Sequence, residues 1–599
     1  MKLKVNTLFP PSLWTRQTIL FAGSLFAKFL LFNLIWCMQT TFTSFSFVGL
    51  YLNMALAALI FLAPYAIGRQ KGLQYGILFL LDAFLIANLM YSRTYYAAIP
   101  LDSYGIASNL SDFTASVYDS LRWIDLLFPL SSLACLYASR KNRQSAGFPS
   151  RKAYLATTGV VCGLTLGLNT LHGGFKNAYA SLQNANYHTC GVPIYTLFGH
   201  LYYQALQEKD LFTPEIGQQI EQWKAQQPSY QPLPDSVPIR TNLVVILCES
   251  LESWVLERTV DGHEITPCLN ALLKEPTTLY APQVLTQVAG GRSIDGQLLL
   301  NAGMLPIQSG SYSMKYPQNT YFTLTKALKE ERGARSYLLT VDKPIVWNQG
   351  VIAKAFGIDT VLSKSSWVLD EKVGSRKKLG DESFFRQTTE KLRKGEIWPE
   401  GEPAYIQCVT YSGHGPFILP DELKRITIAG DYPQRMKDYL VMANYTDHAI
   451  QQLINYLKTR SDYDQTLIVI TGDHEGLASD RVPLTQSASG KGIVSDKPFT
   501  PFIVVNSPIS MRYEKVMGQV DMYTTLLNLL RLDNYPWKGL GQSILDPTKP
   551  AFAISPQLQL EGSTEGIATD IIQHAEKAYT ISDWMIRFDY LKPKKDLPK

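Results

Sequence analysis

The stretch Asn242–Cys248 reads NLVVILC and is followed directly by Glu249. A continuous apolar run that ends in polar residues is typical of a buried parallel strand. A second such run, 466–471 (TLIVIT), ends in Gly-Asp-His-Glu-Gly at 472–476. Shorter strand patterns and a helical pattern lie between and after these runs, at 404–409, 442–458 and 502–505. The alternation predicts an α/β domain with a mostly parallel central sheet and helices on both faces.

Ionisable residues stand directly after both long strands. Glu249 follows the first, and Asp473 and His474 follow the second. In open parallel sheets ligands bind outside the carboxyl ends of the strands, so we expect these side chains to share one edge. Two carboxylates and an imidazole suit Mn²⁺, Mg²⁺ or Zn²⁺, and the lack of thiolates favours the harder ions. Each residue alone is common in turns, but their joint position predicts a metal site.

The segment 289–295 reads AGGRSID and is a candidate for the remaining oxygen ligand. Its glycines allow a tight turn, and the apolar run that follows predicts a helix with Ser293 near its N-terminus. Amides at that position stabilise an anionic phosphate, and metal coordination would make the Ser293 hydroxyl nucleophilic at neutral pH. The alternative is an ordinary N-cap serine with Asp295 in the first turn. Composition by itself favours the alternative.

The first 170 residues are apolar and contain few acids, unlike the charged remainder of the chain. Stretches near the ~20 apolar residues of a membrane-spanning helix occur there; they are 19–38, 47–67, 75–91, 123–139 and 154–168. Lys and Arg residues precede the first stretch and lie between the second and third and between the fourth and fifth. The positive-inside rule places these loops in the cytoplasm and everything after the fifth stretch outside. We therefore expect a multi-pass membrane protein with an extracytoplasmic domain that has no supply of ATP.

These patterns divide the 599 residues into four expected parts. They are a five-helix transmembrane domain (1–170), a juxtamembrane linker with helical spacing at 195–208 and Pro214–Ala225 (171–240), the extracytoplasmic catalytic domain (241–560), and a C-terminal extension packed on it (561–599). The net charge of +5 is small for this length, and no Lys/Arg stripe with interleaved aromatic residues occurs. The chain is therefore not expected to bind nucleic acid.

A set of short motifs resembles, in order, those of the sulfatase-type extracellular domain of lipoteichoic acid synthases, within the alkaline phosphatase superfamily. The motifs are Leu247-Cys248-Glu249-Ser250, Gly291-Arg292-Ser293-Ile294-Asp295, Trp347-Asn348, Gly413-His414-Gly415-Pro416-Phe417 and Gly472-Asp473-His474-Glu475-Gly476. The similarity extends to the membrane half. It implies a C-terminal domain of the sulfatase and alkaline phosphatase fold, anchored in the bacterial cytoplasmic membrane.

The resemblance also implies roles for particular residues. One divalent metal ion, Mn²⁺ by first choice and Mg²⁺ or Zn²⁺ otherwise, would be bound by Glu249, Ser293, Asp473 and His474. Ser293 would be the nucleophile, Arg292 would hold a phosphate, and His414 would contact the phosphate or assist proton transfer. The substrate would be lined by Asp342, Trp347, Asn348 and His414.

Several positions depart from the family pattern. The nucleophile is Ser293 where the family usually has Thr, and Arg292 stands where it has Lys. The Arg that follows Trp-Asn in the synthases is Gln349 here, and a substrate-lining His aligns with Thr340. The last two changes concern the head group that is carried, because neither position belongs to the metal site.

The activity implied is transfer of a phosphoglycerol-type head group from a phospholipid donor, through a covalent Ser293 intermediate, to a lipid or glycan acceptor in the cell envelope. Three alternatives compete with it. A phosphoethanolamine transferase would share the metal site, but those enzymes carry a Cys-rich nucleophile segment. A hydrolytic sulfatase needs a C/S-x-P-x-R context, whereas Ser293 is followed by Ile-Asp-Gly-Gln. A non-enzymatic sensor with a vestigial site would have lost residues such as Glu249.

Overall fold

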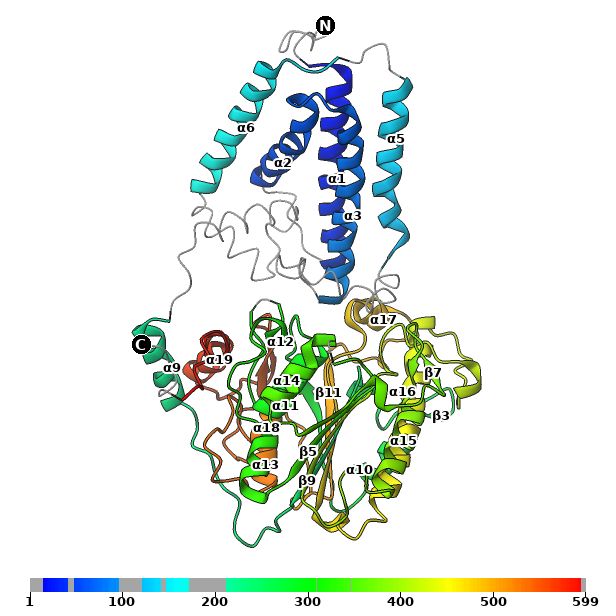
Figure 1. Ribbon diagram of the computed structural model, residues 1–599, viewed down its shortest axis with the longest axis vertical. Helices are drawn as coiled ribbons and strands as arrows, with labels where there is room; N and C mark the ends of the chain where they lie inside the picture. Colours follow the sequence, from blue (N-terminus) through cyan, green and yellow to red (C-terminus); the bar gives the residue numbers. More distant parts are fainter. Residues whose placement is uncertain are drawn as a thin grey trace. The chain divides into compact units, whose positions relative to one another are not determined.

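The computed structural model describes residues 14–40, 48–95, 121–141, 147–171, 212–308, 310–344 and 346–593. The chain forms two compact units (Figure 1). The first comprises Met1–Ser108 and Val117–Leu211, and the second comprises Asn109–Ser116 and Phe212–Lys599. The helical pattern expected at 195–208 lies outside the described residues.

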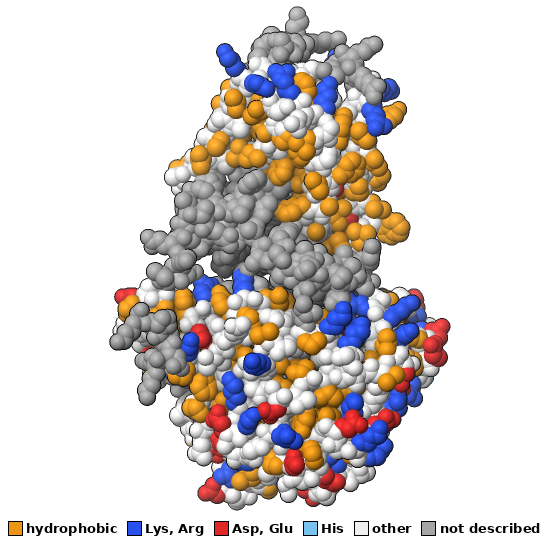
Figure 2. Space-filling model, in the orientation of Figure 1, with side chains coloured by type: hydrophobic (Ala, Val, Ile, Leu, Met, Phe, Trp, Pro, Cys, Tyr) orange, Lys and Arg blue, Asp and Glu red, His pale blue; other side chains and the backbone are white. Residues whose placement is uncertain are grey.

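The described part of the first unit is helical. Its elements are α1 (Arg16–Thr40), α2 (Val48–Ala66), α3 (Lys71–Tyr95), the 3-10 turn η3 (Trp123–Leu126), α5 (Leu127–Lys141) and α6 (Arg151–Leu171). Each expected apolar stretch therefore falls on a helix. Arg16–Trp36 and Lys71–Met90 are long and apolar enough to cross a membrane, and Tyr51–Ala66 is a shorter apolar helix. Hydrophobic side chains dominate the surface of this unit in Figure 2.

Two buried ion pairs join helical elements within the first unit, Lys28 with Asp82 and Arg93 with Asp125. Lys28 on α1 pairs with Asp82 on α3 and also donates to the carbonyl of Phe128 at 2.9 Å and the hydroxyl of Ser131 at 2.7 Å. Ser132 donates to the other carboxylate oxygen of Asp82 at 2.5 Å. All three N–H groups of Lys28 are thus used, as a buried ammonium requires.

A sheet of parallel and antiparallel strands forms the centre of the second unit. Its strand order is β12-β4-β11-β10-β1-β9-β5-β6, with β13 also paired to β4. The bounds are β1 (Asn242–Cys248), β4 (Leu279–Leu285), β5 (Arg335–Thr340), β6 (Thr360–Leu362), β9 (Ala404–Val409), β10 (Thr466–Gly472), β11 (Phe499–Val505), β12 (Met511–Arg512) and β13 (Met517–Gly518). From β10 to β6 all neighbours are parallel, while β11 is antiparallel to both β10 and β4. The mostly parallel α/β domain expected from the sequence is confirmed.

Helices cover both faces of this sheet (Figure 1). One face packs against α11 (Ser293–Ala302), α13 (Leu324–Arg332), α14 (Gln349–Ala355), α18 (Val520–Leu529) and α19 (Thr569–Arg587), and the other against α10 (Pro267–Leu273), α15 (Asp381–Arg393) and α16 (Gln434–Leu457). Strand β1 supplies Leu243, Val245 and Leu247 to the first core and Val244, Ile246 and Cys248 to the second. Alternate side chains point to opposite faces, which explains why the whole run is apolar.

Short elements complete the described part of the second unit. They are α9 (Pro214–Ala225), α12 (Tyr312–Lys315), α17 (Arg481–Gln486), β2 (Thr259–Val260), β3 (His263–Glu264), β7 (Lys372–Val373), β8 (Lys378–Leu379), β14 (Phe552–Ile554) and β15 (Leu560–Gly562). Helix α9 begins at the Thr213 N-cap, as the helical spacing there predicted. The ring of Trp223 on α9 stacks on His574 of α19, with centroids 4.4 Å apart.

Candidate metal centre and nucleophile

Three of the predicted ligands meet at the carboxyl ends of β1 and β10. The strands are parallel neighbours, and their register pairs Cys248 with Gly472, so the residues that follow lie side by side. The Nε2 atom of His474 is 3.4 Å from Oε1 of Glu249 and 3.6 Å from Oδ2 of Asp473. All three side chains are buried. The sequence prediction that these groups share one edge is met by the geometry.

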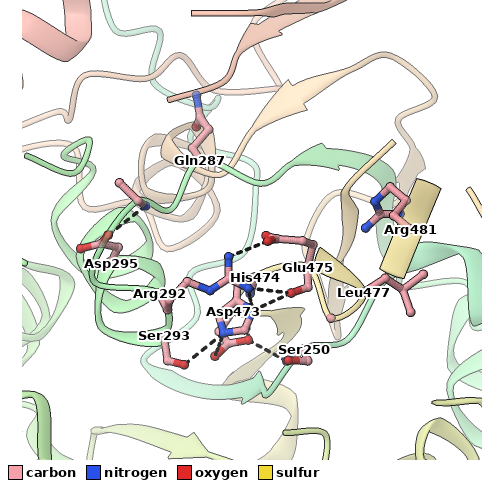
Figure 3. Close-up of polar contacts among 12 residues, drawn as sticks. Ser250, Gln287, Arg292, Ser293, Asp295, Asp473, His474, Glu475, Leu477 and Arg481 are labelled. Atoms are coloured by element: carbon pink, nitrogen blue, oxygen red, sulfur yellow. Dashed lines mark hydrogen bonds and ion pairs between the residues drawn. The ribbon is translucent and has the colours of Figure 1, made fainter. Parts of the chain in front are cut away.

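Ser293 approaches the same cluster from α11. It is the first residue of the helix, and its Oγ lies 3.3 Å from Oε2 of Glu249 and 3.3 Å from Nε2 of His474 (Figure 3). A Cβ atom at Gly296 would come within 2.7 Å of the main-chain oxygen of Asp473. Only glycine at this position lets the first turn of α11 pack directly on the end of β10.

The loop before Ser293 is held by a buried carboxylate. Oδ2 of Asp295 accepts hydrogen bonds from the amides of Ala289 and Gly291, both at 2.9 Å. Burial raises the pKa of Asp295 to about 7, although these two hydrogen bonds act in the opposite direction. Arg292, between the loop and Ser293, has a φ of 50°, a conformation that costs a non-glycine residue energy. Asp295 therefore stabilises the turn that precedes Ser293.

The donor set fits a divalent cation. Burial, and then the charge of Asp473, raises the pKa of Glu249 to about 7, which shows how costly two adjacent buried carboxylates are in the absence of a cation. The Oδ2 atom of Asp473 is buried and has no hydrogen-bond partner among the described residues. Three oxygens and one imidazole nitrogen suit Mn²⁺, Mg²⁺ or Zn²⁺.

Nδ1 of His474 has two polar neighbours. It lies 2.8 Å from the carbonyl oxygen of Glu475, which can only accept, and 3.0 Å from Nη2 of Arg292, which can only donate. Nε2 faces Glu249, Asp473 and Ser293. A ring nitrogen held in this way is the usual arrangement of a metal-binding histidine.

Sequence reasoning missed the side chains that support the loop after β10. Oε1 of the fully buried Glu252 accepts from the amide of Gly476 at 2.7 Å, the amide of Leu477 at 2.9 Å and the guanidinium of Arg481 at 2.8 Å. Asp473 contributes as well, since its Oδ1 accepts from the amide of Ser250 at 2.8 Å. No local pattern marks Glu252 as special, because its partners lie more than 220 residues away.

The predicted substrate-lining residues follow β5 and β9. His414 comes after β9, where its Nδ1 donates to the carbonyl of Gly415 at 2.7 Å and its ring stacks on Tyr411 with centroids 5.5 Å apart. Burial, and then the charge of Arg376, lowers the pKa of His414 to about 3. Asp342 follows β5 and forms an ion pair with Lys378. Neither Arg376 nor Lys378 belongs to a predicted motif.

Three other family positions lie on the turn before α14 and at the first residue of that helix. Trp347 and Asn348 have φ values of 53° and 54°, and the side chain of Asn348 donates to the carbonyl of Ser313 at 3.0 Å. Gln349 is buried, and its amide lies 3.3 Å from the side-chain oxygen of Gln297 on α11. The structure therefore ties Asn348 and Gln349 to the protein itself, and it gives neither a contact with the four ligands in the described residues.

Comparison with known families agrees with this geometry. Residues 241–532 match the family described as Sulfatase. This domain belongs to the sulfatase family. The chain is homologous to lipoteichoic acid synthase 2 of Bacillus subtilis, with 28% identity over 311 residues that cover 51% of this chain and 47% of that protein. It is also homologous to the lipoteichoic acid synthase of Staphylococcus aureus, with 24% identity over 485 residues, 78% of this chain and 73% of that protein.

The match thus spans about half the length of the Bacillus relative and nearly three quarters of the Staphylococcus one. Two solved structures share the fold of this chain. The lipoteichoic acid synthase LtaP of Listeria monocytogenes has a TM-score of 0.52 at 17% identity, covering 62% of this chain and 98% of that one. The lipooligosaccharide phosphoethanolamine transferase A of Neisseria meningitidis has a TM-score of 0.51 at 13% identity, covering 87% and 96%. The family resemblance inferred from the motifs is confirmed.

Proposed function

We propose that this protein is a metal-dependent membrane transferase that moves a phosphoglycerol-type head group from a phospholipid to a lipid or glycan acceptor in the cell envelope. The observation that carries the proposal is the position of Ser293. Its Oγ lies 3.3 Å from a carboxylate oxygen of Glu249 and 3.3 Å from Nε2 of His474. The N-cap position of α11 is occupied by Arg292, and Ser293 is the first residue of the helix, so Ser293 is not an ordinary N-cap serine. Homology to lipoteichoic acid synthases supports the same role.

The reaction has two balanced steps. Oγ of Ser293 attacks the phosphorus of the donor, the Oγ–P bond forms, and the P–O bond to diacylglycerol breaks. The acceptor hydroxyl then forms its own P–O bond, and the Oγ–P bond breaks. The net result is that one proton passes from the acceptor hydroxyl to the released diacylglycerol. A bound divalent ion would lower the pKa of the Ser293 hydroxyl and offset the negative charge of the phosphate.

His414 is the proposed carrier of that proton. Nδ1–H of His414 donates to the carbonyl oxygen of Gly415. Nε2 is therefore the atom that accepts and returns a proton. Burial and nearby cations keep its pKa at about 3 in the substrate-free protein. An anionic phosphate beside the ring would offset those cations and raise the pKa of His414. Proton transfer would then be linked to the presence of substrate.

The first unit is proposed to be a multi-pass membrane anchor that leaves the sulfatase-family domain outside the cytoplasm. Basic side chains of the loop between α2 and α3 and of the loop between α5 and α6 gather at one end of the helices. The guanidinium of Arg69 and the ammonium of Lys71 each lie 5.3 Å from the ring of Phe148, and Arg151 donates to the carbonyl of Ile67 at 2.9 Å. A cluster of basic side chains at one end of the helices is what the positive-inside rule requires of a cytoplasmic face. An anchor in the cytoplasmic membrane suits an enzyme whose donor and product are lipids.

Mass spectrometry of the full chain tests the proposal. The protein would be incubated in detergent with Mn²⁺ and either phosphatidylglycerol or phosphatidylethanolamine. We expect a glycerophosphate adduct on Ser293 that is lost with chelator and in Ser293→Ala, and is kept in Ser229→Ala, an exposed serine. A dominant phosphoethanolamine adduct would favour the rival transferase. Release of glycerophosphate to water at the same rate with and without an acceptor would favour a hydrolase.

A further inference from the structure

The β7–β8 hairpin brings two cations, Arg376 and Lys378, to the carboxyl edge of the sheet. Gly374, with a φ of 74°, turns the hairpin so closely that a Cβ atom there would lie 3.0 Å from the ring of Tyr411. The ammonium of Lys378 forms an ion pair with Asp342 and lies 4.4 Å from the centroid of the same ring. This hairpin lies outside the family motifs of the sequence.

The ion pair stands beside the proposed reaction centre. Strands β1, β9 and β5 are consecutive parallel neighbours, so the end of β5 lies about 10 Å from the end of β1 at the usual strand spacing. The Tyr411 ring under Lys378 stacks in turn on His414. The charges of Arg376 and Lys378 both act on the imidazole of His414. The hairpin therefore closes the β5 side of the edge at which Ser293 carries its phosphate.

The pairing changes what Asp342 can recognise. A carboxylate at this position would be a natural counter-ion for an ammonium head group. In this protein the counter-ion of Asp342 is already present as Lys378, whose side chain is only 16% exposed. An incoming ammonium would therefore meet two cations of the hairpin and a neutralised carboxylate. A hydroxylated head group meets no such repulsion, since one hydroxyl can accept from Lys378 and another can donate to Asp342.

We propose that Lys378 is a specificity-determining residue that excludes cationic head groups and admits neutral, polyhydroxylated ones. This inference rests on the proposed function, because it concerns the group that Ser293 carries. It also gives a physical reason why the departures at Thr340 and Gln349 need not lead to phosphoethanolamine transfer. The charge that selects the head group comes from the hairpin and not from the turn before α14.

A competition experiment tests the role of Lys378. The full chain with Mn²⁺ would be given vesicles of equal phosphatidylglycerol and phosphatidylethanolamine, and the ratio of the two adducts on Ser293 would be measured. We expect the wild type to carry mainly glycerophosphate and Lys378→Gln to shift the ratio toward phosphoethanolamine by about tenfold or more. The matched control is Lys377→Gln, the exposed neighbour in the same hairpin, which should leave the ratio unchanged.

Two further variants separate selectivity from damage to the fold. Lys378→Arg keeps the charge and should keep the wild-type ratio, with an unfolding temperature recorded for every variant. Adding Asp342→Asn to Lys378→Gln removes the freed counter-ion and should cancel the gain in phosphoethanolamine. An unchanged ratio in folded Lys378→Gln overturns this inference alone. A wild type that prefers phosphatidylethanolamine overturns both this inference and the phosphoglycerol-type function. Absence of any adduct from either lipid overturns the proposed function and the inference with it.

Discussion

Arg292 holds Glu475 at two points: its Nη1 lies 2.5 Å from Oε1 of the carboxylate, and its Nη2 donates to the main-chain carbonyl at 3.0 Å. The same carbonyl oxygen lies 2.8 Å from Nδ1 of His474, and Nη2 of Arg292 lies 3.0 Å from that nitrogen. Burial would raise the pKa of Glu475, but the charges of Arg292 and His474 outweigh it and lower that pKa. In the substrate-free protein Arg292 therefore orients His474, the proposed metal ligand, in addition to any contact with phosphate.

Replacing Glu475 with Gln should weaken metal binding by about 10- to 100-fold, because partners of this kind orient the ligand. Arg292→Lys should have a similar effect, since one ammonium cannot reach both the carboxylate and the carbonyl. Isothermal titration with Mn²⁺ measures the change, and Glu565→Gln, an exposed site, is the control. Unaltered Mn²⁺ affinity in both variants would show that the pair does not position His474.

Metal affinity should rise with pH and then level off near pH 7. Burial and Asp473 raise the pKa of Glu249 from 4.5 to about 7, so below that pH an ion must displace a proton. The protonated carboxyl stabilises the metal-free fold fully below its unfolded pKa of 4.5, and this stabilisation is lost as pH rises through about 7. Titrations should show about tenfold weaker Mn²⁺ binding per pH unit below about 7. Equal affinity at about pH 6 and about pH 8 would contradict the shift.

The strand-end residues were predictable because their signal is local. The apolar runs of β1 and β10 locate two strands, and the polar residues after them must share an edge if the strands are parallel. Strand β4 was missed, since Pro282 and Gln283 interrupt its apolar pattern and proline argues against a sheet interior.

Long-range pairs were out of reach of the sequence for a different reason. Asp342 and Lys378 are separated by 36 positions, and neither lies in a recognisable strand or helix pattern. Their pairing depends on where the β7–β8 hairpin folds back on Tyr411. The same holds for Asp295, which the sequence placed only in the first turn of a helix, whereas the structure buries it under the loop that precedes Ser293.

Asp295→Ala should abolish most activity while leaving the metal ligands in place. The variant loses both hydrogen bonds that close the loop before Ser293, and each amide left unpaired in a buried site costs about 1–3 kcal/mol. Asp295→Asn keeps an acceptor oxygen of the same shape and should retain far more activity. Formation of the Ser293 adduct, measured alongside Mn²⁺ affinity, compares the two variants. Equal activity of Asp295→Ala and Asp295→Asn would show that these hydrogen bonds do not hold the loop in its active conformation.

Lys28→Met should destabilise the first unit by about 3–5 kcal/mol, because it leaves Asp82 buried without a counter-ion. The double variant Lys28→Met with Asp82→Leu removes both charges and should recover most of that loss. Thermal unfolding of the full chain in detergent provides the measurement, with the exposed Lys152→Met as control. If the double variant is no more stable than the single one, the pair does not act as a unit.

His414 should make the second unit less stable in acid. Burial and Arg376 lower its folded pKa from 6.5 to about 3, so folding favours the neutral ring. The resulting stabilisation is complete above the unfolded pKa of 6.5 and is lost as pH falls toward about 3. His414→Gln cannot titrate and should lose less stability than the wild type between about pH 7 and about pH 4. Urea unfolding at both pH values gives the comparison, in which the acids common to both proteins cancel. If wild type and His414→Gln lose the same stability between the two pH values, folding does not lower the pKa of His414.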